Sequence, residues 1–242
     1  MAQRAISTVP GVVLGLLAAV LAIQLALKAA EPRPTATALD LPDPPPSAAL
    51  QLAAIGEPIA TANLLSLYLQ AFDNQPGISI PFKDLDYAKV ESWLTRILDL
   101  DPPGQYPLMM ASQVYGQVLP DPKKQRQMVE FVYRQFLIDP NRRWRWLAHA
   151  AIMAKHRLKD PELALRLARA LTEHATASSV PDWAKQMHIF VLEDMGEIET
   201  VKILLGGLLV SGTITDSHEI HFLTERLKAL QSAENSSTTS KR

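Results

Sequence analysis

The sequence predicts an all-α protein in which a single N-terminal transmembrane helix precedes an α-solenoid of stacked helical hairpins. Residues 9–27 form an almost uninterrupted apolar run, and aspartate–proline pairs recur every 18 to 21 residues between positions 101 and 161. The sequence contains no Asn-Gly or Asp-Gly hairpin turn. We therefore expect a tail and membrane helix at 1–30, a proline-rich linker at 31–46, a helical-repeat domain at 47–233 and a disordered tail at 234–242.

The apolar run reads VPGVVLGLLAAVLAIQLAL, and Gln24 is its one strongly polar side chain. A helix needs about 20 apolar residues to cross a bilayer core, and the run just reaches this length. A cleaved signal peptide should end in small residues at the positions that flank the cut, but Leu27 or Lys28 would occupy the outer position here. We expect a retained signal-anchor, and a cleaved signal peptide remains the alternative.

The charges that flank the apolar run set the expected orientation. Arg4 and the terminal amine precede the run, whereas Lys28 and Arg33 follow it, so the positive-inside rule gives almost a tie. A very short tail before a long domain is typical of anchors that leave the tail in the cytoplasm. We expect a single-pass membrane protein with its domain in the periplasm or otherwise outside the cytoplasm, and a cytoplasmic domain remains the alternative.

Residues 31–46 contain six prolines in sixteen positions. Proline fixes φ and lacks an amide donor, which favours an extended polyproline II conformation. At roughly 3.1 Å per residue, this linker would span about 50 Å.

The aspartate–proline pairs predict where the helices of the domain begin. Aspartate accepts hydrogen bonds from free amides of the first helical turn, and proline fits the first helical position. Each interval then holds one helix of about 14–16 residues and a short turn. The pairs are Asp101-Pro102, Asp121-Pro122, Asp139-Pro140 and Asp160-Pro161.

Two segments between these pairs resemble the closing helix of the tetratricopeptide repeat family. They are residues 93–102, WLTRILDLDP, and residues 133–140, YRQFLIDP. Small and aromatic residues follow at positions where the family has them, namely Ala111, Ser112, Tyr115, Trp146, Ala150 and Ala164. The resemblance covers residues 84–175 but departs from the family in period, because 38 residues separate Pro102 from Pro140 where the family repeats every 34. It implies a scaffold that presents a groove to a peptide or protein.

Basic residues are concentrated in the middle of the chain. Residues 121–170 hold twelve Lys and Arg against five Asp and Glu, a local net charge of +7 in a chain whose net charge is −1. We predict that this basic band contacts a protein partner with an acidic surface or peptide. The alternative is that Trp144 or Trp146 belongs to the core and the arginines are solvated. The predicted partner-binding residues are Arg142, Arg143, Trp144, Arg145, Lys155 and Arg157.

The sequence carries no motif for catalysis, a cofactor or a metal. It has no cysteine, which excludes a disulfide scaffold, a cysteine nucleophile and thiolate-bound metals. His218 and His221 lie three residues apart rather than at the i, i+4 spacing of the zincin helix, and no third ligand is indicated. The near-zero net charge argues against a nucleic-acid partner. We therefore predict that the protein is not an enzyme.

Two hypotheses about function remain. The first is a membrane-tethered helical-repeat scaffold or adaptor that binds a protein partner in a bacterial envelope complex. The alternative is an accessory factor or enzyme of envelope polymer or lipid metabolism, which would hold an anionic substrate on the basic band.

Overall fold

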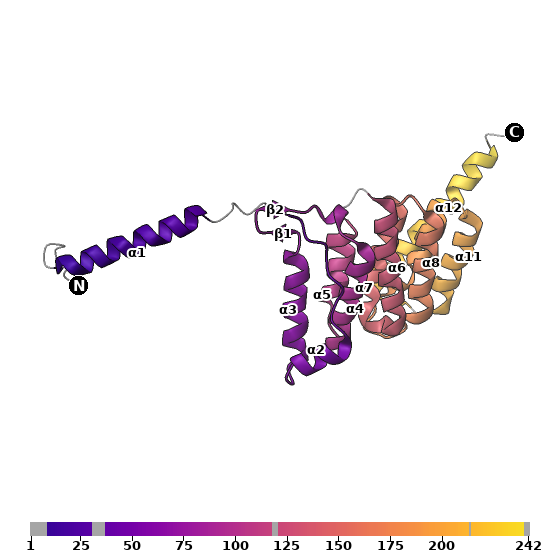
Figure 1. The fold of residues 1–242 in the computed structure, drawn as a ribbon. Coiled ribbons are helices and arrows are strands. Elements are labelled where there is room, and N and C mark those ends of the chain that lie inside the picture. Colours follow the sequence, from indigo (N-terminus) through magenta and orange to yellow (C-terminus); the bar gives the residue numbers. More distant parts are fainter. Residues whose placement is uncertain (1–8, 31–36, 118–120, 213, 240–242) are drawn as a thin grey trace. The chain divides into compact units, whose positions relative to one another are not determined.

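The computed structural model describes residues 9–30, 37–117, 121–212 and 214–239 (Figure 1). It is mostly helical, as predicted, and the described strands form one short hairpin, β1 (Asn74–Gln75) and β2 (Ile78–Ser79). The chain divides into two compact units, the first with residues 1–38 and 76–78 and the second with residues 39–75 and 79–242.

The first unit contains helix α1 (Gly11–Ala30). Its segment Gly11–Ala29 is long and apolar enough to cross a membrane, and none of it is buried inside the protein. A helix that is apolar all round and unburied is suited to lipid rather than to water. The tail at 1–8 and the first part of the linker, 31–36, lie outside the described residues.

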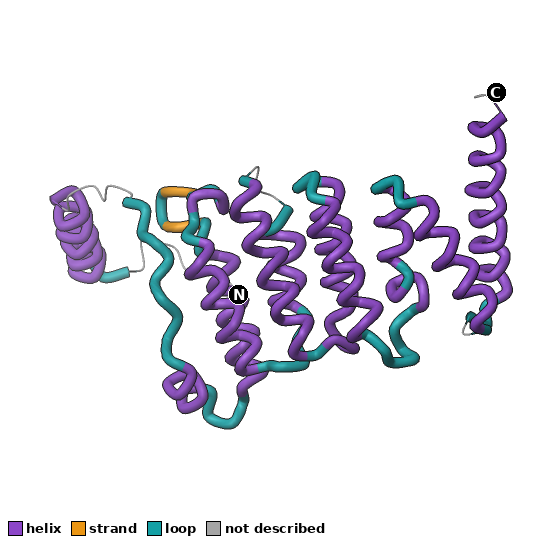
Figure 2. Tube along the Cα trace, turned by 90° about the vertical axis from the view of Figure 1, so that its right-hand side faces the viewer, coloured by secondary structure: helices purple, strands orange, loops and turns teal. Residues whose placement is uncertain are grey.

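The second unit is a row of helices in which each packs mainly on its neighbours in the sequence (Figure 2). Helix α3 packs on α4, α6 on α7, α7 on α8, α8 on α10, and α11 on α12. The elements are α2 (Ser47–Ala53), α3 (Pro58–Ala71), the 3-10 turn η2 (Phe82–Asp84), α4 (Tyr87–Leu100), α5 (Tyr106–Met109), the π-helical segment η3 (Met110–Tyr115), α6 (Pro122–Ile138), α7 (Pro140–His156), α8 (Pro161–His174), α9 (Asp182–Lys185), α10 (Met187–Asp194), α11 (Ile198–Ser211) and α12 (Ser217–Thr239).

Three of the four aspartate–proline pairs begin a helix, as predicted. Asp121 accepts hydrogen bonds from the amides of residues 123 and 124, and Asp160 accepts one from residue 163. Asp139 both ends α6 and precedes α7, without a side-chain cap. The prediction is wrong for Asp101, which ends α4 and is followed by a turn. Pro103 explains the difference, because a residue that precedes proline is disfavoured in the helical region.

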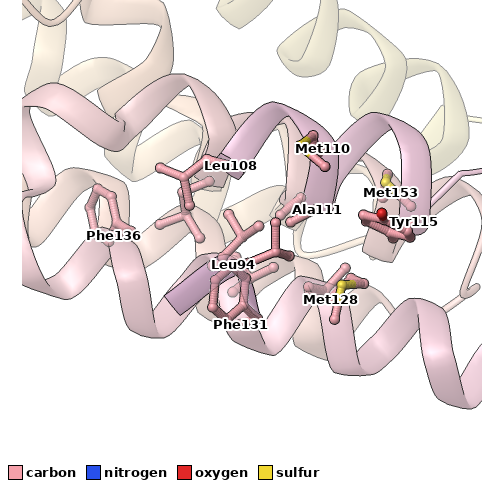
Figure 3. Packing of buried hydrophobic residues seen from close by; sticks show 14 of the residues in the cluster. Leu94, Leu108, Met110, Ala111, Tyr115, Met128, Phe131, Phe136 and Met153 are labelled. Carbon is pink, nitrogen blue, oxygen red and sulfur yellow. The ribbon is translucent and has the colours of Figure 1, made fainter. Parts of the chain in front are cut away.

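The core of the second unit consists of two clusters of buried side chains. The larger runs from Leu41 to Val191 and the smaller joins α10, α11 and α12. Figure 3 shows part of the larger cluster, where side chains of α4, α5, η3, α6 and α7 meet. Tyr115 is fully buried there, and its hydroxyl donates a hydrogen bond to the carbonyl of Leu69 (3.3 Å). Burial raises the pKa of Tyr115, so its hydroxyl stays protonated.

The end of the predicted linker belongs to the helical domain rather than to a free spacer. Residues 37–46 form neither a helix nor a strand, and Leu41 is buried (2% exposed) in the larger cluster. The indole N–H of Trp93 donates a hydrogen bond to the Pro42 carbonyl (2.8 Å), and the Leu39 backbone exchanges two hydrogen bonds with the Gln75 side chain (2.8 Å each). Because these residues lie outside helices and strands, their carbonyls can accept hydrogen bonds from side chains.

The C-terminal segment also differs from the prediction. Disorder was expected from residue 234, whereas α12 continues through Thr239. Once a helix has formed, each added residue gains a backbone hydrogen bond, so a helix can extend beyond its packed part. Residues 240–242 lie outside the described part of the chain.

Candidate functional site

Helix α7 carries the N-terminal group of predicted partner-binding residues. Arg142 is exposed, and its guanidinium pairs with Asp139, the residue that precedes the helix (2.9 Å). Arg145 is also exposed, and its guanidinium lies over the ring of Trp144, 5.4 Å from the ring centre. Trp144 is 9% exposed and belongs to the larger core cluster, as the alternative predicted, which corrects its assignment to the partner-binding residues. Its ring meets that of Trp183 of α9 edge to face, with ring centres 5.6 Å apart. One exposed cation and two indoles therefore form a continuous cluster.

Arg143 does not belong to this surface, which corrects its assignment to a partner-binding site. It is only 3% exposed. Its guanidinium donates hydrogen bonds to the backbone carbonyl (2.7 Å) and side-chain oxygen (2.9 Å) of Gln135 and to the carbonyl of Pro102 (2.9 Å). Gln135 lies in the last turn of α6, whose carbonyls lack partners within the helix. Arg143 therefore caps α6 and ties it to the loop after α4.

Burial lowers the pKa of the Arg143 guanidinium, and the nearby charge of Asp139 opposes this shift. The side chain forms part of a cleft of about 470 Å³ between the ends of several helices. The cleft lining also includes Asp99, whose carboxylate pairs with Arg96 (3.0 Å). Arg143 is bonded to carbonyl oxygens and Asp99 is paired with Arg96. The polar groups of this cleft therefore hold the ends of neighbouring helices together.

Lys155 and Arg157 lie at the opposite end of α7 from Arg142. Lys155 forms an ion pair with Asp194 of α10, and Arg157 donates a hydrogen bond to the carbonyl of Gln117 (2.6 Å). Ten residues separate Lys155 from Arg145, which corresponds to about 15 Å along a helix. The structure therefore does not bring the six predicted residues together, and it divides them between the two ends of one helix.

Several cations of the predicted basic band are paired with carboxylates. The pairs join different helical elements, and two of their three carboxylates, Asp160 and Glu130, belong to the band itself. The exposed cations that form such pairs are Arg126 with Asp160, Arg134 with Glu91, and Arg166 with Glu130. The surface around these residues is consequently a network of mixed charge rather than a positive field.

One exposed stripe of α7 combines predicted and unpredicted residues, and we call it the outer face of α7. It consists of Arg142, Arg145, His149, Ile152 and His156, whose spacing of three and four residues places them on one side of the helix. The sequence indicates this face through the helical spacing of the five residues. A count of charges along the basic band does not reveal that spacing.

Amide side chains border the outer face of α7. The indole N–H of Trp146 donates a hydrogen bond to the side-chain oxygen of Gln105 (2.7 Å), and the Gln117 amide contacts the Nε2 atom of His149 (2.7 Å). Burial lowers the pKa of His149, and the charge of Arg157 adds to this effect. At neutral pH, His149 is therefore a neutral hydrogen-bonding group within the face.

The chemistry of this face is that of recognition. The face offers the guanidiniums of Arg142 and Arg145, and the half-exposed indole of Trp183 lies nearby against Trp144. Arginine and aromatic residues are enriched in protein interfaces. Among the described residues, no group of three or more His, Asp or Glu side chains is placed to hold a metal ion.

Comparisons with protein-family models, with curated proteins and with solved structures found no match for this chain.

Proposed function

We propose that the protein is a membrane-tethered helical-repeat scaffold that binds a protein partner through the outer face of α7. The observation that carries the proposal is the exposed Arg145 guanidinium, held over the ring of the buried Trp144, with the half-exposed Trp183 beside that ring. Arginine and tryptophan are the residues most enriched among those that dominate binding energy at interfaces. Among the described residues, no ion pair joins Arg145 to a carboxylate, so its charge is available for an acidic group of a partner.

The packing of the domain supports a repeat architecture of the tetratricopeptide type. Helices α6, α7 and α8 have similar lengths and follow one another through short turns. The small residues of the family resemblance, Ala111, Ala150 and Ala164, are buried where neighbouring helices meet. Such stacking of hairpins gives an extended surface for a peptide or a protein.

The distribution of charge favours a protein partner over an anionic polymer. A polymer of like charges is attracted by a continuous positive field, whereas the basic band is interrupted by ion pairs such as Arg126 with Asp160. A mixed surface with aromatic groups instead complements the polar surface of another protein.

We further propose that α1 is retained and places the domain outside the cytoplasm.

The proposal is tested by purifying the tagged full-length protein in mild detergent and identifying what accompanies it. The test variant is Arg145→Glu, and the matched control is Arg169→Glu, which reverses another exposed arginine, on α8. We expect the first variant to lower recovery of a stoichiometric protein at least about tenfold, the cost of losing one interface anchor. The control should retain the partner. Equal loss from both variants, or recovery of lipid or polysaccharide without a protein, would refute the proposal.

A further inference from the structure

The hairpin of α2 and α3 carries an apolar surface that no other element of its unit covers. Leu52 is 82% exposed, Ile55 88% and Leu64 66%, and Ile59, Leu67 and Tyr68 are exposed as well. Glu57 is the one charged residue between positions 47 and 72. Single exposed leucines are common on soluble proteins, but a group of this size marks a surface that contacts something apolar.

The position of α3 in the fold makes this composition unusual. α3 packs on α4 through one side, which includes Ala62, Ser66 and Leu69, and it lies at the end of the row of helices (Figure 2). The last helix of such a row needs a polar outer side when it faces water. The outer side of α3 instead exposes four large apolar or aromatic side chains and carries no charge, with Asn63 as its exposed amide. Together, α2 and α3 are apolar enough to pass as a membrane segment, although they meet at a bend of 115°.

The turn between α2 and α3 presents its most exposed side chain through an unfavourable backbone conformation. Ile55 has a φ of 50°, in the left-handed region that β-branched residues rarely adopt. Backbone strain of this kind persists where it serves a purpose, such as holding a side chain in a required position. Here it holds an isoleucine outward at the tip of the hairpin.

The length of the tether identifies what this surface meets. Because Leu39 is bonded to Gln75, close to the end of α3, eight residues separate α1 from the helical domain. At no more than about 3.3–3.6 Å per residue, this stretch can extend to roughly 30 Å. The docking of residues 39–46 thus shortens the tether by half. A domain held so close to a bilayer meets the lipid surface at high effective concentration.

We propose that the exposed side of α2 and α3 docks into the lipid surface of the membrane that α1 spans, and we call this side the lipid face. Its residues are Leu52, Ile55, Ile59, Leu64, Leu67 and Tyr68. Leucine and isoleucine side chains enter the boundary between headgroups and acyl chains, and tyrosine is favoured at that level. The near absence of charge on the face means that few charged groups lose water on docking.

The test uses the absence of cysteine from the sequence, because each introduced cysteine is then the sole labelling site. Full-length Leu64→Cys and Leu67→Cys variants are labelled with an environment-sensitive NBD dye and reconstituted into phosphatidylcholine–phosphatidylglycerol vesicles. The matched control is Ile203→Cys on α11, an exposed apolar helical position (74% exposed). Far-UV circular dichroism of each variant verifies that the helices are retained.

We expect dyes at 64 and 67 to show blue-shifted emission and at least twofold quenching by phosphatidylcholine that carries a doxyl group near the headgroup. The dye at 203 should emit as in water and resist quenching. A blue shift at 64 and 67 without lipid quenching, reversed when the protein is diluted in excess lipid, would assign the face to a second copy and overturn the proposal. Equal quenching at all three positions, or none, would also overturn it.

Discussion

Replacement of Arg142 and of Arg143 by alanine should have very different effects on stability, although the two residues are neighbours. The Arg143 guanidinium makes three hydrogen bonds, to two oxygens of Gln135 and one of Pro102, and is buried. A hydrogen bond to a charged group contributes about 1.5–3 kcal/mol to stability. Because Pro102 is exposed, water replaces that bond in the variant. We therefore expect Arg143→Ala to lower the free energy of unfolding by about 2–4 kcal/mol in total.

Arg142 provides the comparison within the same helical turn. Its ion pair with Asp139 is exposed on both sides, and exposed pairs contribute about 0.2–1 kcal/mol. For a domain of this size, each kcal/mol shifts the thermal midpoint by about 2–4 °C. Arg143→Ala should thus lower the midpoint by roughly 5–15 °C and Arg142→Ala by no more than about 4 °C.

The assay is thermal unfolding of the detergent-solubilised full-length protein, followed by circular dichroism at 222 nm. Arg143→Lys adds a second comparison, because lysine keeps the charge but lacks the planar fork that reaches two acceptors at once. We expect its midpoint to lie between those of the wild type and Arg143→Ala. Equal midpoints for Arg142→Ala and Arg143→Ala would show that Arg143 does not cap α6.

Three further predictions concern the tip of the hairpin, the half-buried His149 and the docked linker. Ile55→Asn should raise the free energy of unfolding by about 1 kcal/mol, because asparagine tolerates the left-handed region, and a lower thermal midpoint would contradict this. The pKa of His149 is lowered in the folded protein. As the pH falls below about 6.5, the unfolded chain therefore takes up the proton first, and the free energy of unfolding decreases. His149→Gln should reduce the drop in thermal midpoint between pH 7 and pH 5. Leu41→Ala should lower the free energy of unfolding by about 2 kcal/mol or more and make the linker susceptible to limited proteolysis. Leu39→Ala, at an exposed position, should have neither effect.

The helices were predictable because their signals are local. Asp121 and Asp160 cap the helices that follow them as expected from the chemistry of one side chain and the next few amides. The spacing of Leu163, Leu167 and Leu171 likewise predicted their burial. The wrong prediction at Asp101 also has a local cause, because Pro103 disfavours a helical conformation of the residue before it.

The candidate site was less predictable because burial depends on helix phase and on partners far away in the sequence. Arg143 lies four residues before the buried Leu147, so its inward position could have been inferred from the spacing of α7. The hydrogen-bond acceptors of Arg143 could not be inferred in this way, because only the packing of α4 and α6 brings Pro102 and Gln135 close to Arg143. The same holds for the ion pair of Arg126 with Asp160, which are 34 residues apart in the sequence and both within the band.

The docked linker limits the distance between the membrane helix and the helical domain. By fixing residues 39–46 on the domain, the contacts of Leu41 and Trp93 turn a tether of sixteen residues into one of eight. A shorter tether restricts how far the domain can tilt and favours contact of the lipid face with the bilayer. The outer face of α7 belongs to a different helix, separated from α3 by α4 and α6 along the row. Lipid docking through α3 thus leaves the Arg145 cluster accessible, so one domain can contact the membrane and a protein partner at the same time.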